Sequence, residues 1–88
     1  MHMTTQEIVN EFTNGATEGV ASGGRLTIQG DKLVNYSTVI AQRLDDGSYV
    51  INVTKYSPTT SKHQNRLKYA LCRYDEVDDM PVGIQDLV

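Results

Sequence analysis

The first stretch of apolar residues in the chain has the spacing of a helix. Ile8–Phe12 (IVNEF) places three apolar side chains on one side of a helical turn pattern. The preceding Thr4–Glu7 (TTQE) has the form of a capping box, in which a threonine and a glutamate satisfy the first free amides. Asn14-Gly15 is typical of a helix stop. The sequence therefore predicts a helix over residues 5–14 that buries this apolar stripe.

A glycine-rich segment follows the predicted helix. Residues 15–24 contain four glycines, separated by small or polar residues. A phosphate-binding loop requires GxxxxGK[ST] leading into a helix, and here the glycines lead into Leu26-Thr27-Ile28, which has the character of a strand. Residues 15–24 are therefore predicted to be a flexible connector.

The middle of the chain alternates between β-prone runs and turn signals. Residues 26–29 and 32–36 flank Gly30-Asp31, and a longer β-prone run follows. Asp45–Ser48 (DDGS) is a strong hairpin signal, because Asp-Gly supplies a positive φ at low cost. The return strand over residues 49–56 is rich in β-branched and aromatic residues. These segments predict an antiparallel sheet of three to four strands.

A second helix is expected after Ser57-Pro58, because proline cannot donate to a strand ladder and is well placed in a first helical turn. Residues 62–74 carry one apolar face, formed by His63, Leu67, Ala70, Leu71 and Tyr74. The predicted class is α+β in the order α-β-β-β-α, with residues 1–88 as a single domain. Residues 1–3 have the look of a cloning remnant, and residues 75–88 of an acidic tail.

Charge is unevenly distributed along the chain. The sequence holds 8 basic and 11 acidic residues, a net charge of −3. Residues 55–73 contain five bases and no acid, whereas residues 74–88 contain five acids and no base. On the predicted second helix, Lys62, Arg66, Tyr69 and Arg73 form one stripe. Three interpretations stay open: a surface that faces a ligand, an ordinary solvated face, or a face that the acidic tail neutralises by folding back.

The start of this helix is the densest polar run in the sequence. A helix N-terminus presents free amides and the positive end of a dipole, which suits a phosphate or a carboxylate. The alternative explanation of this polar run is redundant helix capping and turn formation. For His63, the alternative to ligand binding is packing in the core. The candidate ligand-binding residues are Lys55, Tyr56, Ser57, Thr59, Thr60, Ser61, Lys62, His63, Arg66, Tyr69 and Arg73.

The sequence has no catalytic or metal-binding signature. A single cysteine, Cys72, excludes an intramolecular disulfide and a zinc site built from cysteines. His63 and Cys72 are nine residues apart, which places them on opposite sides of a helix. We therefore expect no catalytic residues, no metal, no cofactor and no enzymatic activity.

The segments from Asn35 to Ala41 (NYSTVIA) and from Asn52 to Asn65 (NVTKYSPTTSKHQN) carry a resemblance. Their N-x-TKYS-x-TTSKHQ pattern is similar to that of a family of small proteins and domains of unassigned function, encoded by bacteriophages and related mobile elements. The resemblance covers about residues 35–70. It implies a phage-type source and a setting in the cytoplasm of a host cell, which agrees with the expected absence of a signal peptide and of a membrane span. It implies no particular chemistry.

These observations lead to three expectations about function. The first is an inhibitor of a host defence complex, similar in role to an anti-CRISPR protein, whose acidic residues imitate phosphates on a protein partner; they are Asp75, Glu76, Asp78 and Asp79. The alternative is direct binding of nucleic acid or of a phosphorylated ligand through helix 62–73 and its N-terminus. The third is a homo-oligomer formed through an apolar face of the sheet.

Overall fold

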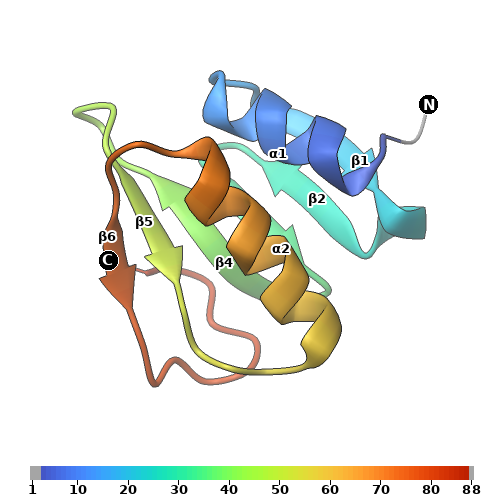
Figure 1. Cartoon of the computed structure of the whole chain (residues 1–88), viewed down its shortest axis with the longest axis vertical. Helices are drawn as coiled ribbons and strands as arrows, with labels where there is room; N and C mark the ends of the chain where they lie inside the picture. The colour runs from blue at the N-terminus through green and yellow to red at the C-terminus, as the bar shows by residue number, and fades with distance from the viewer. Residues whose placement is uncertain (1–2, 88) are drawn as a thin grey trace.

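The computed structural model describes residues 3–87. Of the expected cloning remnant at residues 1–3, Met1 and His2 lie outside the described residues, and Met3 N donates to Val20 O at 2.8 Å. Two helices and six strands follow one another along the chain (Figure 1). They are α1 (Thr5–Thr13), β1 (Glu18–Ala21), a 3-10 turn η1 (Ser22–Gly24), β2 (Leu26–Gln29), β3 (Lys32–Asn35), β4 (Thr38–Arg43), β5 (Tyr49–Asn52), α2 (Pro58–Ala70) and β6 (Asp75–Val77). The α+β class is as predicted.

The strands form one mixed sheet in sequential order, β1 to β6. Every neighbouring pair is antiparallel except β5 and β6, which run parallel because α2 carries the chain back between them. The predicted sheet of three to four strands is therefore too small. The two additional strands are β1, within the predicted connector, and β6, within the predicted tail.

Gly19 explains why the sequence pattern did not predict β1. A Cβ atom at this position would lie 3.3 Å from Ile28 Cδ1 and 3.6 Å from Ile8 Cγ1. The glycine therefore permits α1 to pack closely against β1 and β2. A Cβ would be tight only against the flexible end of Ile28, which would have to shift by a few tenths of an ångström, so a glycine with little strand preference suits this close approach.

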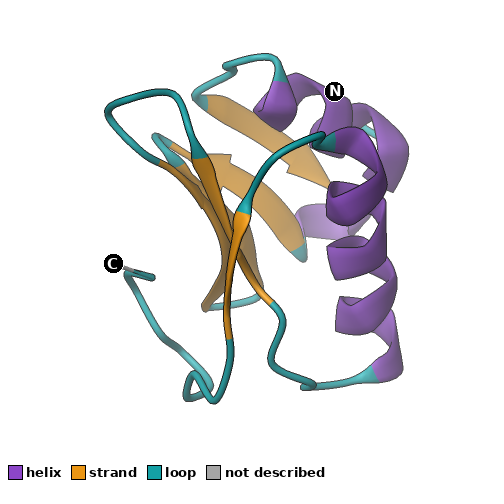
Figure 2. Cartoon of the chain, turned by 60° about the vertical axis from the view of Figure 1, so that its left-hand side comes forward, coloured by secondary structure: helices purple, strands orange, loops and turns teal. Residues whose placement is uncertain are grey.

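The two faces of the sheet are covered differently. Both helices lie on one face, and the chain after β6 crosses the other (Figure 2). The core on the helical side contains Ile8, Val9, Phe12, Ala21, Leu26, Ile28, Leu33, Ile40, Ala41, Ile51 and Leu67. On the opposite side, Val34, Val39, Val50 and Leu87 are buried together. Coverage of both faces explains the run of buried residues along β4, since a half-exposed strand would alternate.

The predicted acidic tail is thus an integral part of the fold. Its backbone is fixed by hydrogen bonds from Val39 N to Ile84 O (3.0 Å) and from Leu87 N to Gln42 Oε1 (2.8 Å). Asp86 forms an ion pair with Lys32 at 2.9 Å. The apolar sheet face on which the expectation of a homo-oligomer rested is covered by this segment.

Helix α2 begins and ends four residues earlier than the predicted range of 62–74. Ser57 is its N-cap, with its hydroxyl accepting from Thr60 N at 3.2 Å, and Pro58 occupies the first helical position. The helix ends at Leu71, whose extended backbone (φ −107°, ψ 129°) carries the chain towards β6. By contrast, α1 agrees with the prediction to one residue, and its Thr4/Glu7 capping box is present.

Arg43, at the end of β4, connects the sheet to the C-terminal end of α1. Its guanidinium donates to Phe12 O at 2.7 Å and to Ala16 O at 3.0 Å. The same group lies 5.0 Å from the centre of the Phe12 ring and 5.8 Å from that of Tyr49. Phe12 O also accepts from Gly15 N and from the Tyr49 hydroxyl, so Arg43 adds a charged donor to a shared acceptor at the helix end.

We expect Arg43→Lys to lower the free energy of unfolding by roughly 1–3 kcal/mol, although the charge is kept. Both carbonyl bonds come from Nη2, while Nε donates to the Tyr49 hydroxyl at 3.3 Å. A lysine ammonium cannot reproduce these donors together with a planar group that lies against two rings. Urea denaturation measures the effect, with Arg25→Lys at an exposed arginine as the matched control. Equal midpoints for Arg43→Lys and the wild type would contradict this role.

Candidate functional site

The polar segment around the start of α2 divides into an inward and an outward half. The inward half is built on Asn52, which is completely buried at the end of β5. Its amide donates to Val39 O at 3.1 Å and to the Tyr56 hydroxyl at 2.8 Å. Tyr56 in turn donates to Met80 O at 2.8 Å, and Gln64 donates to Asn52 O and to Thr54 O. These side chains hold the fold together.

The cap of α2 belongs to the same inward group. Ser57 donates to Thr60 Oγ1 at 3.1 Å, and the Thr60 hydroxyl donates to Asn35 Oδ1 at 2.6 Å. Asn35 then donates to Arg25 O at 3.0 Å. Of the hydroxyl residues predicted to bind a ligand, Tyr56, Ser57 and Thr60 are therefore engaged within the protein. Thr59 and Lys55 are exposed, and Ser61 is half-buried.

His63 is buried on the inner side of α2. Only 5% of its surface is exposed, and neither ring nitrogen has a hydrogen-bond partner among the described residues. Burial lowers the pKa of His63, and the positive charge of Arg66 lowers it further. The imidazole is therefore held neutral, and its place in the core fits the packing explanation rather than ligand binding.

The outward half of the segment is a short stripe on the exposed side of α2. Lys62, Arg66 and Tyr69 follow one another at helical spacing, and Tyr69 is 93% exposed. With Gln6 of α1 and Asn65, these three side chains line a shallow hollow of about 410 Å³. Arg66 donates to Gln6 Oε1 at 2.8 Å, which orients the guanidinium beside Tyr69. We call Lys62, Arg66 and Tyr69 the α2 stripe.

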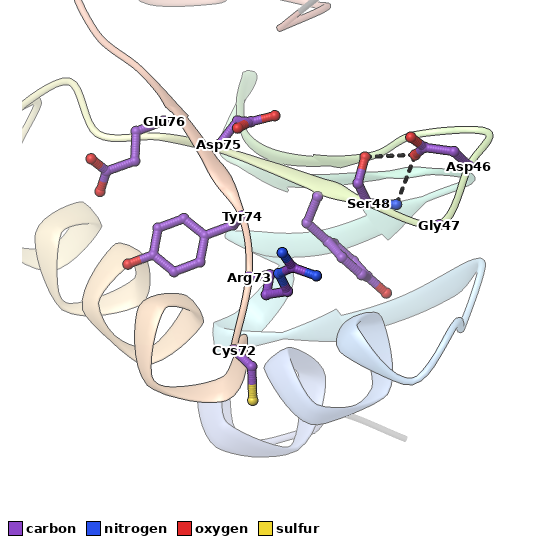
Figure 3. A pocket seen from close by; sticks show the side chains of 9 residues that line it. Asp46, Gly47, Ser48, Cys72, Arg73, Tyr74, Asp75 and Glu76 are labelled. Atoms are coloured by element: carbon purple, nitrogen blue, oxygen red, sulfur yellow. Dashed lines mark hydrogen bonds between the residues drawn. The ribbon is translucent and has the colours of Figure 1, made fainter.

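Arg73 does not belong to this stripe, because α2 ends before it. It lies instead in an open groove of about 1040 Å³ between the β4–β5 turn and the segment that leads into β6. In Figure 3, Arg73 lies between Tyr74 and the β4–β5 hairpin, where Asp46 accepts from Ser48. Asp75 and Glu76 line the same groove. The predicted four-residue stripe is therefore wrong at its last member.

The predicted acidic residues lie on an ordered sheet edge. Asp75 and Glu76 are exposed on β6, the outermost strand, and Asp78 and Asp79 follow in the next turn. Glu76 lies 3.9 Å from Lys68. Among residues 3–87, no ion pair joins these acids to the α2 stripe, so the alternative in which the tail neutralises the stripe is wrong, and the alternative of a solvated face stays open.

Three residues at these hollows carry no strong signal in the sequence. Gln6 and Asn65 line the same hollow as the α2 stripe, and because both are uncharged, the charge pattern of the sequence does not indicate them. Tyr36, in the β3–β4 turn, is 63% exposed and lines a second hollow beside the start of α2. The only sequence signal for Tyr36 was its position in the NYST part of the recognised pattern.

The chain belongs to a family of unknown function, DUF8033, whose model matches residues 3–79. The match includes both the α2 stripe and β6 and ends before the segment that crosses the second sheet face. Searches of curated proteins and of solved structures find no match. No helix within residues 3–87 is long and apolar enough to cross a membrane.

The buried His63 predicts that stability depends on pH. Its pKa in the folded state lies below the ordinary 6.5, so folding favours the neutral ring. This contribution is complete above the unfolded pKa and is lost as the pH falls from about 6.5 towards the folded pKa. We expect the urea midpoint to fall between pH 8 and 5.5, and His63→Leu to reduce this dependence. Identical pH dependence in both proteins would exclude His63 as its source.

Proposed function

We propose that this protein is a non-catalytic binding protein that binds nucleic acid through the α2 stripe. The observation that carries the proposal is the position of Tyr69, almost fully exposed beside two cations without carboxylate partners in the described part of the chain. A tyrosine in this position contributes little to the core. A ring at the end of a row of two cations provides a stacking surface for a base and charges for the adjoining phosphates.

The net charge of −3 is compatible with this function because the charges are separated in space. Lys68, the helix cation that pairs with Glu76, is two residues after Arg66 and so about 200° away around the helix axis. Salt screens exposed charges beyond about 8–10 Å. The α2 stripe therefore presents a local positive surface on a chain that is acidic overall.

The acidic edge has a complete structural explanation, whereas a solvated helix face explains Lys62 and Arg66 but not the exposed ring of Tyr69. An edge strand exposes unpaired backbone groups and is prone to pair with another chain, and short, charged edge strands prevent this. Strand β6 has three residues, two of which are acids. For this reason the nucleic-acid hypothesis is placed before the inhibitor hypothesis.

We expect the double variant Lys62→Ala, Arg66→Ala to weaken binding of labelled oligonucleotides at low salt. The slope of log K against log salt concentration becomes shallower by about 0.7 for each phosphate of a single strand that the variant no longer neutralises. Fluorescence anisotropy over a range of salt concentrations measures both quantities. The matched control is Lys68→Ala, a cation on the same helix that faces Glu76, which leaves binding nearly unchanged. Equally weakened binding in all variants would indicate nonspecific charge attraction and would contradict the proposal.

A second candidate is docking of the acidic edge onto a basic groove of a host protein, such as a nucleic-acid-binding subunit of a defence complex. The supporting observation is that the carboxylates are ordered before any partner binds: they lie on β6 and in a turn where Asp79 N donates to Asp78 Oδ1 at 2.7 Å. Preordered charge lowers the entropic cost of association. The similarity to phage proteins adds the biological setting.

The two explanations of the acidic edge predict different behaviour after neutralisation of its acids, Asp75→Asn, Glu76→Gln, Asp78→Asn and Asp79→Asn. If the acids only protect the edge, the variant self-associates at high concentration in sedimentation experiments, and its set of co-purifying host proteins is unchanged. If they form a docking surface, a protein captured by the wild type from host lysate is no longer captured. A monomeric variant that retains the same captured protein would contradict both roles.

A further inference from the structure

The two halves of the recognised sequence pattern, about 20 residues apart, meet at one small hollow. The β3–β4 turn supplies residues 35–38, and the start of α2 supplies Tyr56, Ser57 and Thr60. The hollow measures about 220 Å³. This is less than the roughly 300–1,000 Å³ of sites that enclose a whole small molecule, so it suits a single ring-sized group.

The deeper wall of this hollow is rigid. Asn35 and Thr60 are buried and bonded to each other, and the Thr38 hydroxyl accepts from Gly83 N at 2.9 Å. A group that enters therefore meets a preformed surface. Its rim, in contrast, carries the two large exposed apolar side chains Tyr36 and Val82, which are 63% and 79% exposed.

Tyr36 has a backbone conformation that is unfavourable for a tyrosine. Its φ is +58°, a left-handed conformation that favours glycine or asparagine and is an outlier for a bulky residue. Its amide donates to Arg25 O at 2.7 Å, so the turn is fixed by main-chain contacts. Packing does not require the ring, because it is mostly exposed. An unfavourable, exposed aromatic residue at a pocket rim is a sign of ligand contact.

We infer that the Tyr36 hollow is a base-binding subsite and that the nucleic acid bound by this protein is single-stranded. The inference rests on the proposed function of the α2 stripe. Thr60 lines the hollow on the inner side of α2, and Lys62 begins the stripe about 200° around the same helix. A strand that reaches both must bend around the start of α2, which a flexible single strand can do and a stiff duplex cannot. A base inserted beside the Tyr36 ring must be unpaired, because bases in a duplex are stacked on each other.

The test separates stability from binding at the same position. Tyr36→Asn places a residue that tolerates positive φ in the turn, so the thermal midpoint is expected to stay equal to that of the wild type or to rise. Removal of the stacking ring is expected to weaken binding of a mixed-sequence single strand about fivefold or more. Tyr36→Phe keeps the ring and is expected to bind as the wild type does.

Anisotropy with a labelled single strand and with a hairpin duplex measures these affinities, and 2-aminopurine in the single strand reports stacking. Preference for the single strand, with binding and 2-aminopurine quenching both reduced in Tyr36→Asn, supports the inference. If Tyr36→Asn binds like the wild type while Lys62→Ala, Arg66→Ala does not, the subsite is wrong and the proposed function stands. A wild type that binds neither nucleic acid overturns both. A lowered thermal midpoint in Tyr36→Asn assigns the ring to packing and overturns the subsite.

Discussion

The buried amide of Asn52 is the constraint on which the arrangement of this fold depends. A buried amide without partners would cost free energy comparable to a missing hydrogen bond or more, so its donors and acceptor must all be matched. Its partners come from β4 (Val39 O), from the loop before α2 (Tyr56) and from the backbone of Thr54. Through Tyr56 the network also reaches Met80 O, where the chain turns onto the second sheet face. One side chain thereby fixes the exit from β5, the start of α2 and the return of the C-terminal segment.

This network also decides which parts of the polar segment are available to a ligand. Side chains on the inner side of α2, such as Thr60, His63 and Gln64, are buried against the sheet. Those on the outer side, such as Lys62 and Arg66, are directed away from it. The segment thus has two roles that alternate with the helical period. Its density of hydroxyl groups reflects the demands of a buried polar network, and only the outer residues are left for recognition.

The sequence predicted the elements whose signals are local. The Thr4/Glu7 capping box defined the start of α1, and the Asp-Gly turn defined the β4–β5 hairpin. It did not predict β1, because the glycine at position 19 has little strand preference and its close approach to Ile28 depends on packing between β1 and β2. The predicted end of α2 was too late because the chain becomes extended at Leu71, where no glycine or proline marks a helix end. Arg73 therefore lies after the helix and is not part of the α2 stripe. Which hydroxyl groups face inward depends on contacts between distant strands, such as Thr60 with Asn35.

Tyr36 and Tyr69 are the two aromatic residues that this fold does not require. Phe12 and Tyr49 pack edge to face with 5.7 Å between their ring centres, and Tyr56 completes the buried network. Tyr69 is exposed on a helix, where smaller polar residues are equally suitable, and Tyr36 is exposed in a turn whose positive φ favours asparagine or glycine. A chain of 88 residues has a small core, so an aromatic side chain left in solvent does not provide the stability that its burial would give. Residues that can be replaced without loss of stability are best explained by contacts with a binding partner. Tyr69 lies on α2, and Tyr36 lines a hollow with residues at the start of α2.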